Sequence, residues 1–184
     1  REHLFSNVPV FHSLSELEEM MAVVAMIEAA ARLPAYRRAV LAWAPEIARV
    51  DPGPRGVFMG YDFHLGAGGA KLIEVNTNAG GAFLNALLAR AQRACCAEVS
   101  EALRLPMFED FDAALIAMFR AEWSRQRGDA RLQRITIVDD DPPNQYLYPE
   151  FLLAREAFRR HGFEAEIADA SALRHADGRL WVGS

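Results

Sequence analysis

Two carboxylates and one amide stand at spacings that could hold a divalent cation. Asp62 belongs to the run GYDFHLG, and Glu74 and Asn76 belong to the run KLIEVNT, so that Glu74 is the twelfth residue after Asp62. Magnesium prefers oxygen ligands and typically takes one or two carboxylates, while water and substrate phosphates fill the rest of its shell. If these three side chains lie together, they could hold Mg²⁺ and leave positions open for a nucleotide.

A glycine-rich segment directly after these residues is suited to bind an anion. Asn78, Gly80 and Gly81 lie between the second run and a long helix-forming segment. The exposed N–H groups at a helix N-terminus attract anions, and glycine lets a ligand approach the backbone closely. We therefore expect these three residues to border a metal-bridged phosphate or an acyl phosphate. An ordinary strand-to-helix turn is the alternative explanation of the glycine pair.

The alternation of apolar and polar residues predicts that the two runs form an antiparallel hairpin. A three-residue loop over residues 67–69 would place Asp62 opposite Glu74 and Gly60 opposite Asn76 on one polar face. A two-residue loop would send Asp62 to the other face. We expect the three-residue loop, because the apolar alternation selects its register, and this register brings the carboxylates together. A solvated strand face without a cation is the alternative.

The same register assigns the remaining cross-strand pairs of the hairpin. It predicts one packed apolar face, and it places one histidine on the polar face. The expected pairs are Tyr61 with Val75, Phe63 with Ile73, and His64 with Leu72.

The composition limits the classes of function. The 184 residues carry a net charge of −5, and this acidic balance argues against a nucleic-acid binder. Lys71 is the only lysine. No apolar run is long enough to span a bilayer, so we expect a cytoplasmic protein without membrane contact. The adjacent Cys95 and Cys96 lack the spacing of a metal site and would point to different faces of a helix. Because the chain opens at Arg1 and closes just after a strand at Ser184, we expect it to be part of a longer protein.

Helical and strand patterns suggest an α+β fold in two modules. Residues 1–128 form the first module and contain the hairpin at 57–77, and residues 129–184 form the second, an incomplete βαβ unit. Expected helices span residues 13–33, 34–48, 81–103, 110–126 and 146–161. Expected strands span residues 57–65, 71–77, 134–139 and 164–168, and another begins at 178.

The segment YDFHL…KLIEVNTNAGG resembles the metal-binding hairpin of ATP-grasp enzymes, such as D-alanine–D-alanine ligases and glutathione synthetases. The second module resembles the Rossmann-like domain that precedes the ATP-grasp fold in such ligases. Because the hairpin here comes first, the order is similar to that of circularly permuted, glutathionylspermidine-synthase-like proteins. The resemblance covers roughly residues 56–184.

This resemblance implies an ATP-dependent carboxylate–amine or carboxylate–thiol ligase that forms an acyl phosphate. It assigns Asp62, Glu74 and Asn76 to Mg²⁺, and it places the loop from Asn78 to Gly81 beside the substrate. The partners would be small-molecule or peptide carboxylates and amines or thiols, and the enzyme would form a homodimer. The family's phosphate-binding lysines and glycine-rich flap are not found in the sequence, and we expect them after Ser184. No catalytic side chain is assigned.

Two other functions are compatible with the sequence. One is a non-catalytic binding or scaffold protein that keeps the hairpin. The other is a nucleotide-binding protein built on the βαβ half, with ligand contacts near Asp139, Asp140 and Asp141 at the carboxyl end of a strand. A solvated acidic turn explains the three aspartates equally well. Gln145, Tyr148 and Glu150 could line the same edge.

Overall fold

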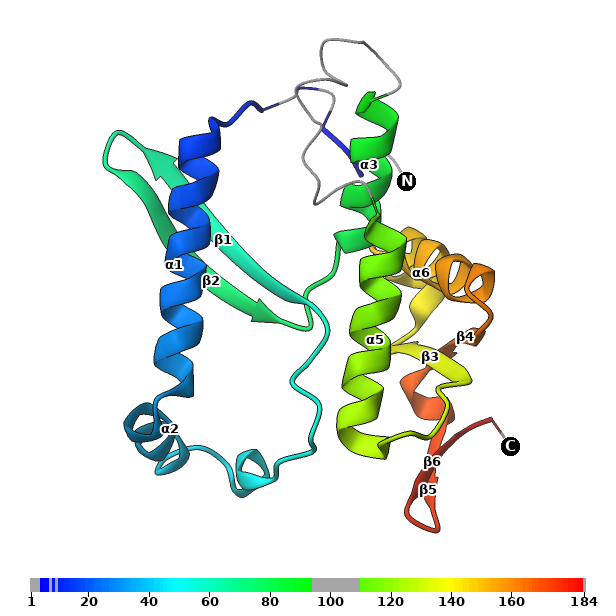
Figure 1. The fold of residues 1–184 in the computed structure, drawn as a ribbon. Coiled ribbons are helices and arrows are strands. Elements are labelled where there is room, and N and C mark those ends of the chain that lie inside the picture. The colour runs from blue at the N-terminus through cyan, green and yellow to red at the C-terminus, as the bar shows by residue number, and fades with distance from the viewer. Residues whose placement is uncertain (1–3, 7, 9, 94–109, 184) are drawn as a thin grey trace. The chain divides into compact units, whose positions relative to one another are not determined.

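A computed structural model describes residues 4–6, 8, 10–93 and 110–183. Helices and strands both contribute substantially, as expected for an α+β protein (Figure 1). The chain divides into two compact units, Arg1–Ala79 and Gly80–Ser184. Cys95 and Cys96 lie outside the described residues. Among the described helices, none combines the length and apolar character needed to cross a membrane.

The first unit begins with a well-capped helix, α1 (Leu14–Arg32). The Ser13 hydroxyl accepts a hydrogen bond from the backbone N–H of Glu16, and the Glu16 carboxylate accepts one from the backbone N–H of Ser13 at 2.7 Å. This reciprocal capping box satisfies two N–H groups at the helix start. The two hydrogen bonds hold the pKa of Glu16 below its ordinary value of 4.5, with the bond from the Ser13 backbone as the largest cause.

The second helix, α2 (Pro34–Leu41), is shorter than the sequence predicts. Pro34 opens it, as expected, but a turn follows at residues 42–44, and a separate 3₁₀ helix, η1, spans Glu46–Arg49. Pro45 lies between the two, and proline lacks the N–H that a continuous helix would require. The prediction of one helix through residue 48 is therefore wrong.

The hairpin consists of β1 (Met59–Gly66) and β2 (Gly69–Thr77) (Figure 1). Its turn has two residues, because Gly66 pairs directly with Gly69. The predicted three-residue loop is therefore wrong. Gly69 has a φ of 83°, in the region that favours glycine.

A β-bulge restores the register that the shorter turn would have lost. The pairing shifts between Asp62 and Phe63, so that Asp62 faces Glu74 while Phe63 faces Leu72. Ile73 is the extra residue in β2, and 64% of its surface is exposed. The predicted pairs near the turn are wrong, since Phe63 does not face Ile73 and His64 faces Lys71 rather than Leu72. The predicted pairs beyond the bulge are confirmed: Tyr61 with Val75, Asp62 with Glu74, and Gly60 with Asn76.

Helix α1 packs across the hairpin, with contacts concentrated on β2 (Figure 1). Its half-buried side chains recur at helical spacing. The Tyr61 hydroxyl donates a hydrogen bond to Glu28 of α1 at 3.2 Å. Burial and the neighbouring Glu28 carboxylate raise the pKa of Tyr61. The apolar stripe on α1 consists of Leu17, Met20, Val23 and Val24.

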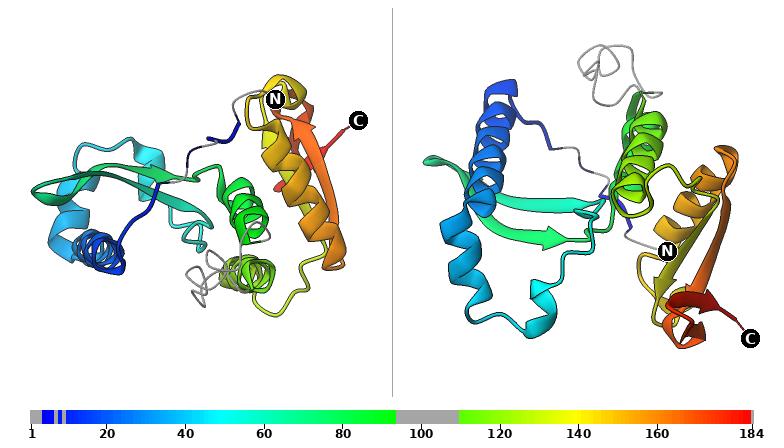
Figure 2. Two further views of the ribbon diagram at one scale, coloured as in Figure 1. Left: turned by 90° about the horizontal axis from the view of Figure 1, so that it is seen from above. Right: turned by 60° about the horizontal axis from the view of Figure 1, so that its bottom comes forward.

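The second unit contains a parallel βαβ arrangement, as predicted. Strands β3 (Arg134–Asp139) and β4 (Glu164–Asp169) pair in parallel, and α6 (Tyr148–Arg160) connects them. The right-hand view of Figure 2 shows α6 running along this two-stranded sheet. Gly162, with a φ of 83°, follows the end of α6 and turns the chain into β4.

Phenylalanine rings form the core of the second unit. Phe158 of α6 is 2% exposed and meets Phe83, Phe119 and Phe163 in edge-to-face contacts with centroid distances of 6.2, 4.9 and 6.4 Å. Phe83 belongs to α3 (Ala82–Arg93) and Phe119 to α5 (Phe111–Arg127). Both helices therefore pack with the βαβ arrangement. For this reason the compact units divide at residues 79 and 80, whereas the sequence predicted a boundary near residue 129.

The remaining predictions for the second unit are close to the observed bounds. Helix α5 begins after Asp110, whose carboxylate accepts a hydrogen bond from the backbone N–H of Ala113. The last part of the helix predicted to reach residue 103 falls in residues 94–109, outside the described range. The chain ends in a hairpin of β5 (Leu173–Ala176) and β6 (Arg179–Val182). The sequence predicted β6 but missed β5.

Candidate metal centre

Three predicted ligands converge on the polar face of the hairpin. The side-chain nitrogen Nδ2 of Asn76 lies 2.9 Å from Oε1 of Glu74 and 3.5 Å from Oδ2 of Asp62. Asp62 and Glu74 are directly opposed across the strands, and Asn76 is on the same strand two residues beyond Glu74. The structure therefore places the two carboxylates and the amide together, as the sequence predicted.

The amide orientation matches a site without a cation. Asn76 donates to both carboxylates, which reduces the repulsion between two negative charges. Rotation about one side-chain bond exchanges the positions of the oxygen and the nitrogen of the Asn76 amide. Two neighbouring ligands of an octahedral Mg²⁺ lie roughly 3 Å apart, given metal–oxygen distances of about 2.1 Å. Rotation of the amide would put its oxygen where the nitrogen lies, 2.9 Å from Glu74. The residues present thus fit a magnesium ion.

No neighbouring cation neutralises these carboxylates within the described part of the chain. None of the ion pairs there involves Asp62 or Glu74. Both side chains, and that of Asn76, are exposed to solvent. A bound cation would therefore find two unpaired acids that are accessible from one face of the hairpin.

Gly60 leaves the space that Ala79 needs beside the hairpin. A Cβ built on Gly60 would lie 3.0 Å from the Cβ of Ala79 and 3.5 Å from the Cβ of Asn76. A contact of 3.0 Å requires one of the neighbours to move. The backbone N–H of Ala79 also donates to the carbonyl of Phe58 at 3.2 Å, which draws the two ends of the hairpin together. Glycine at position 60 therefore lets this end of the hairpin close without crowding Ala79.

A hollow of about 470 Å³ adjoins Asp62 within the first unit. Its volume falls in the range of small-molecule sites. Its wall is mostly apolar, with one carboxylate and one imidazole. The lining residues are His12, Met20, Tyr61, Asp62, Phe63 and Leu65.

Lys71 lies at the turn of the hairpin rather than at the acidic end. A Cβ built on Gly68 would lie 3.8 Å from Nζ of Lys71. His64, which pairs with Lys71, also approaches the turn, since its ring lies 3.6 Å from a Cβ built on Gly66. Neither side chain is therefore a partner of the three converging residues.

The predicted anion-binding turn spans the boundary between the two units. Asn78 belongs to the first unit and has a φ of 57°, a left-handed conformation that asparagine tolerates. Gly80 and Gly81 open the second unit, and Gly81 has a φ of 98°. A Cβ built on Gly80 would lie 2.7 Å from a methyl carbon of Leu147, so a larger residue would collide there. The expectation that these three residues border a ligand stays a prediction.

Glu150 already provides an anion at the start of α3. Its Oε1 accepts hydrogen bonds from the backbone N–H groups of Gly81 at 3.1 Å and Phe83 at 3.0 Å, and its Oε2 accepts one from Leu84 at 2.8 Å. Glu150 is 6% exposed. The dipole of α3 stabilises this buried carboxylate. The sequence suggested that Glu150 lined the edge of the sheet, and no local pattern reveals a partner nearly seventy residues away.

The three aspartates after β3 take part in local turn structure. Asp141 has a φ of 44°, and its backbone N–H donates to Asp169 at 2.7 Å. Its carboxylate accepts a hydrogen bond from Asn144 at 2.8 Å. Asp169 also accepts from the hydroxyl and backbone of Ser171, and these bonds lower its pKa, the hydroxyl being the largest cause. These hydrogen bonds are typical of a solvated acidic turn, which the sequence analysis gave as the alternative to a ligand site.

The described residues contain no cluster of three or more histidine, cysteine or acidic side chains that could hold a metal. The hairpin site has only two acids, and its third donor is an amide. Comparison with known proteins finds no matching family model, no matching curated protein and no matching solved structure.

Proposed function

We propose that this chain contains the metal-binding part of an ATP-dependent carboxylate–amine or carboxylate–thiol ligase. The convergence of Asp62, Glu74 and Asn76 on one exposed face is the observation that carries the proposal. An antiparallel hairpin with these donors agrees with the ATP-grasp resemblance of the sequence. In this proposal the first unit belongs to an ATP-grasp domain, and the βαβ arrangement belongs to a Rossmann-like domain in permuted order.

The three hairpin side chains would act as magnesium ligands. Asp62 and Glu74 would each supply a carboxylate oxygen, and Asn76 would supply its amide oxygen after the rotation described above. Magnesium, when bound, would neutralise phosphate charge of ATP during transfer to the substrate carboxylate. Asn78, Gly80 and Gly81 are proposed to border the nucleotide or the reacting carboxylate. The substrates would be small-molecule or peptide carboxylates and amines or thiols.

The test is calorimetric titration of the polypeptide encoded by the complete gene with a non-hydrolysable ATP analogue. The titration is performed with Mg²⁺ and with a chelator. We expect affinity to rise with Mg²⁺, and we expect Glu74→Gln and Asn76→Ala each to lower the magnesium-dependent affinity by at least about tenfold, equivalent to roughly 1.4 kcal/mol. Both positions are exposed, so neither substitution should unfold the hairpin.

Glu18→Gln is the matched control. Glu18 is an exposed acid of the same unit, but it lies on α1 rather than on the hairpin. This variant should bind the analogue like the unmodified protein. Equal magnesium-dependent binding by Glu74→Gln and the unmodified protein would end the proposal.

A non-catalytic binding protein is the second candidate. The hydrogen bonds that Glu150 accepts from Gly81, Phe83 and Leu84 favour it, because an internal carboxylate occupies N–H groups that the sequence assigned to a ligand. This candidate predicts that the protein binds the Mg²⁺–analogue complex. It also predicts that the protein releases no phosphate from ATP when mixtures of carboxylates and amines are added. Phosphate release that requires Glu74 would favour the ligase.

A further inference from the structure

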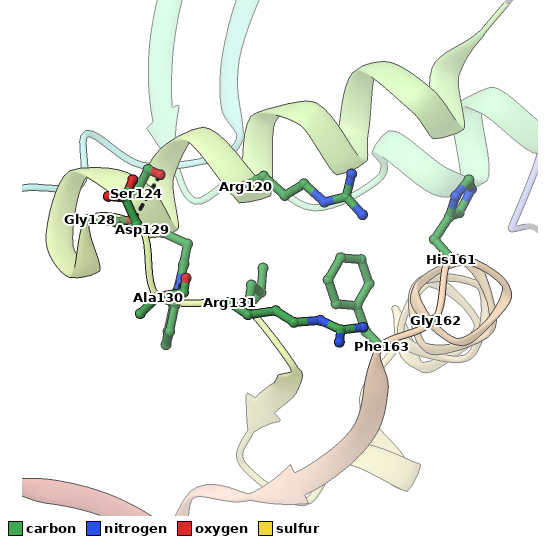
Figure 3. Close-up of a pocket in the computed structure, with 11 residues that line it drawn as sticks. Arg120, Ser124, Gly128, Asp129, Ala130, Arg131, His161, Gly162 and Phe163 are labelled. Atoms are coloured by element: carbon green, nitrogen blue, oxygen red, sulfur yellow. Dashed lines mark hydrogen bonds between the residues drawn. The ribbon is translucent and has the colours of Figure 1, made fainter.

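A second pocket, contained entirely in the second unit, gathers positive charge (Figure 3). It has a volume of about 420 Å³ and lies between the end of α5, the loop after it and the start of β4. Arg120 comes from α5, Arg131 from the loop, and His161 from the end of α6. Three elements thus contribute one basic side chain each.

The basic side chains lie toward one end of the pocket. Figure 3 shows Arg120 and Arg131 extending toward the end where Phe163 and His161 lie, while Asp129 lies at the opposite end. The guanidinium carbon of Arg120 is 5.7 Å from the centre of the Phe163 ring. Phe163 is buried, and the cation–π contact orients Arg120 over it.

In the described part of the chain, Arg120 and Arg131 lack the acidic partners that several other arginines of the same unit have. Arg125, Arg134 and Arg160 form ion pairs with Glu122, Glu164 and Asp112. Among the described residues, no ion pair involves Arg120 or Arg131. This concentration of unpaired positive charge occurs in a chain whose net charge is −5.

Compensation of the helix dipoles accounts for His161, which caps the end of α6, but not for Arg120 and Arg131. The last turn of α5 already contains Arg125 and Arg127, and the last turn of α6 contains Arg159 and Arg160. Basic side chains act on the dipole mainly within the last turn. Arg120 lies earlier in α5, and Arg131 lies beyond its end.

We propose that this pocket binds the phosphate group of a small molecule. Guanidinium groups pair with phosphate through parallel N–H···O bonds, and three donors from three elements suit the several oxygens of a phosphate better than the two of a carboxylate. The pocket is larger than a bare phosphate requires. Trp123, Leu132 and Phe163 line it as well and provide apolar surface for the rest of the ligand.

The probes are phenyl phosphate and inorganic phosphate. Each is titrated into the complete chain in a calorimeter, in the presence of a chelator and in the absence of ATP. We expect saturable binding, tighter for phenyl phosphate because its ring adds apolar contact. Arg120→Gln and Arg131→Gln should each weaken binding by about tenfold, the effect of one charge-assisted contact. The melting temperature of each variant is measured alongside, and Arg131→Gln keeps the contact between Arg120 and the Phe163 ring.

Arg125→Gln is the matched control, since it removes the same charge from the same helix outside the pocket. It should change the affinity less than twofold. The proposal would be overturned if Arg125→Gln weakened binding as much as the pocket variants do, or if no saturable binding were observed. It would also be overturned if benzoate bound as tightly as phenyl phosphate. The hairpin variant Glu74→Gln should leave phenyl phosphate binding unchanged, which separates this site from the proposed magnesium site.

Discussion

Replacement of Glu150 by glutamine should destabilise the second unit, because Glu150 fixes the start of α3. The carboxylate accepts three backbone hydrogen bonds while buried. In Glu150→Gln the amide oxygen can keep the bonds from Gly81 and Phe83, but the amide nitrogen would face the N–H of Leu84. Two donors would then oppose each other in a buried site.

The magnitude follows from the two interactions that are lost. A hydrogen bond to a charged group contributes about 1.5–3 kcal/mol. A negative charge at a helix N-terminus contributes about 0.3–1 kcal/mol. We therefore expect Glu150→Gln to lower the free energy of unfolding of the second unit by roughly 2–4 kcal/mol.

Urea unfolding, followed through amide resonances of the second unit, measures this change. Hydrogen exchange of the Leu84 amide provides a local measurement, since that amide loses its acceptor. Glu156→Gln is the control, because Glu156 is exposed on the same helix and should change stability by less than about 0.5 kcal/mol. A Glu150→Gln variant as stable as this control, with Leu84 equally protected, would refute the role assigned to Glu150.

Two further predictions concern the first unit. Gly60→Val should destabilise the hairpin by about 1–3 kcal/mol, because the added atoms would crowd Ala79. Thermal unfolding measures this loss. Gly56→Ala is the comparison for backbone effects, because position 56 has open space around it but a positive φ. Ser13→Ala should lower α1 stability by about 1 kcal/mol, measured by circular dichroism. Because the folded pKa of Glu16 is depressed, its contribution is present above pH 4.5 and is lost as the pH falls through the folded pKa. The helix signal should therefore weaken on acidification, and a Glu16→Gln variant that is equally sensitive to acid would contradict this cause.

The sequence was sufficient to predict the polar face of the hairpin but not the details of its register. Alternation has a period of two, so it shows that one extra residue is present without showing where it lies. We placed that residue in the turn, whereas the structure places it at Ile73. An exposed isoleucine in an apolar run gives no sign that it belongs to a bulge. The pairs of Asp62 and Asn76 were therefore predicted correctly, although the predicted turn was wrong.

Long-range contacts explain the other differences. The boundary between compact units depends on Phe158 meeting rings from α3 and α5, and these contacts are not visible in local patterns. The same is true of Glu150, which resembles any acid in the first turn of a helix. By contrast, the strands and helix of the βαβ arrangement depend on local patterns, and their predicted bounds differ from the observed ones by at most two residues.

The most direct measurement is a titration with Mn²⁺, a paramagnetic substitute for Mg²⁺, followed by amide resonances of the chain. We expect the signals of Asp62, Glu74 and Asn76 to broaden first and to recover when Mg²⁺ is added in excess. Glu74→Gln should abolish this early broadening. Broadening that begins around Asp139–Asp141 while the hairpin signals stay sharp would contradict the assignment of the cation to the hairpin.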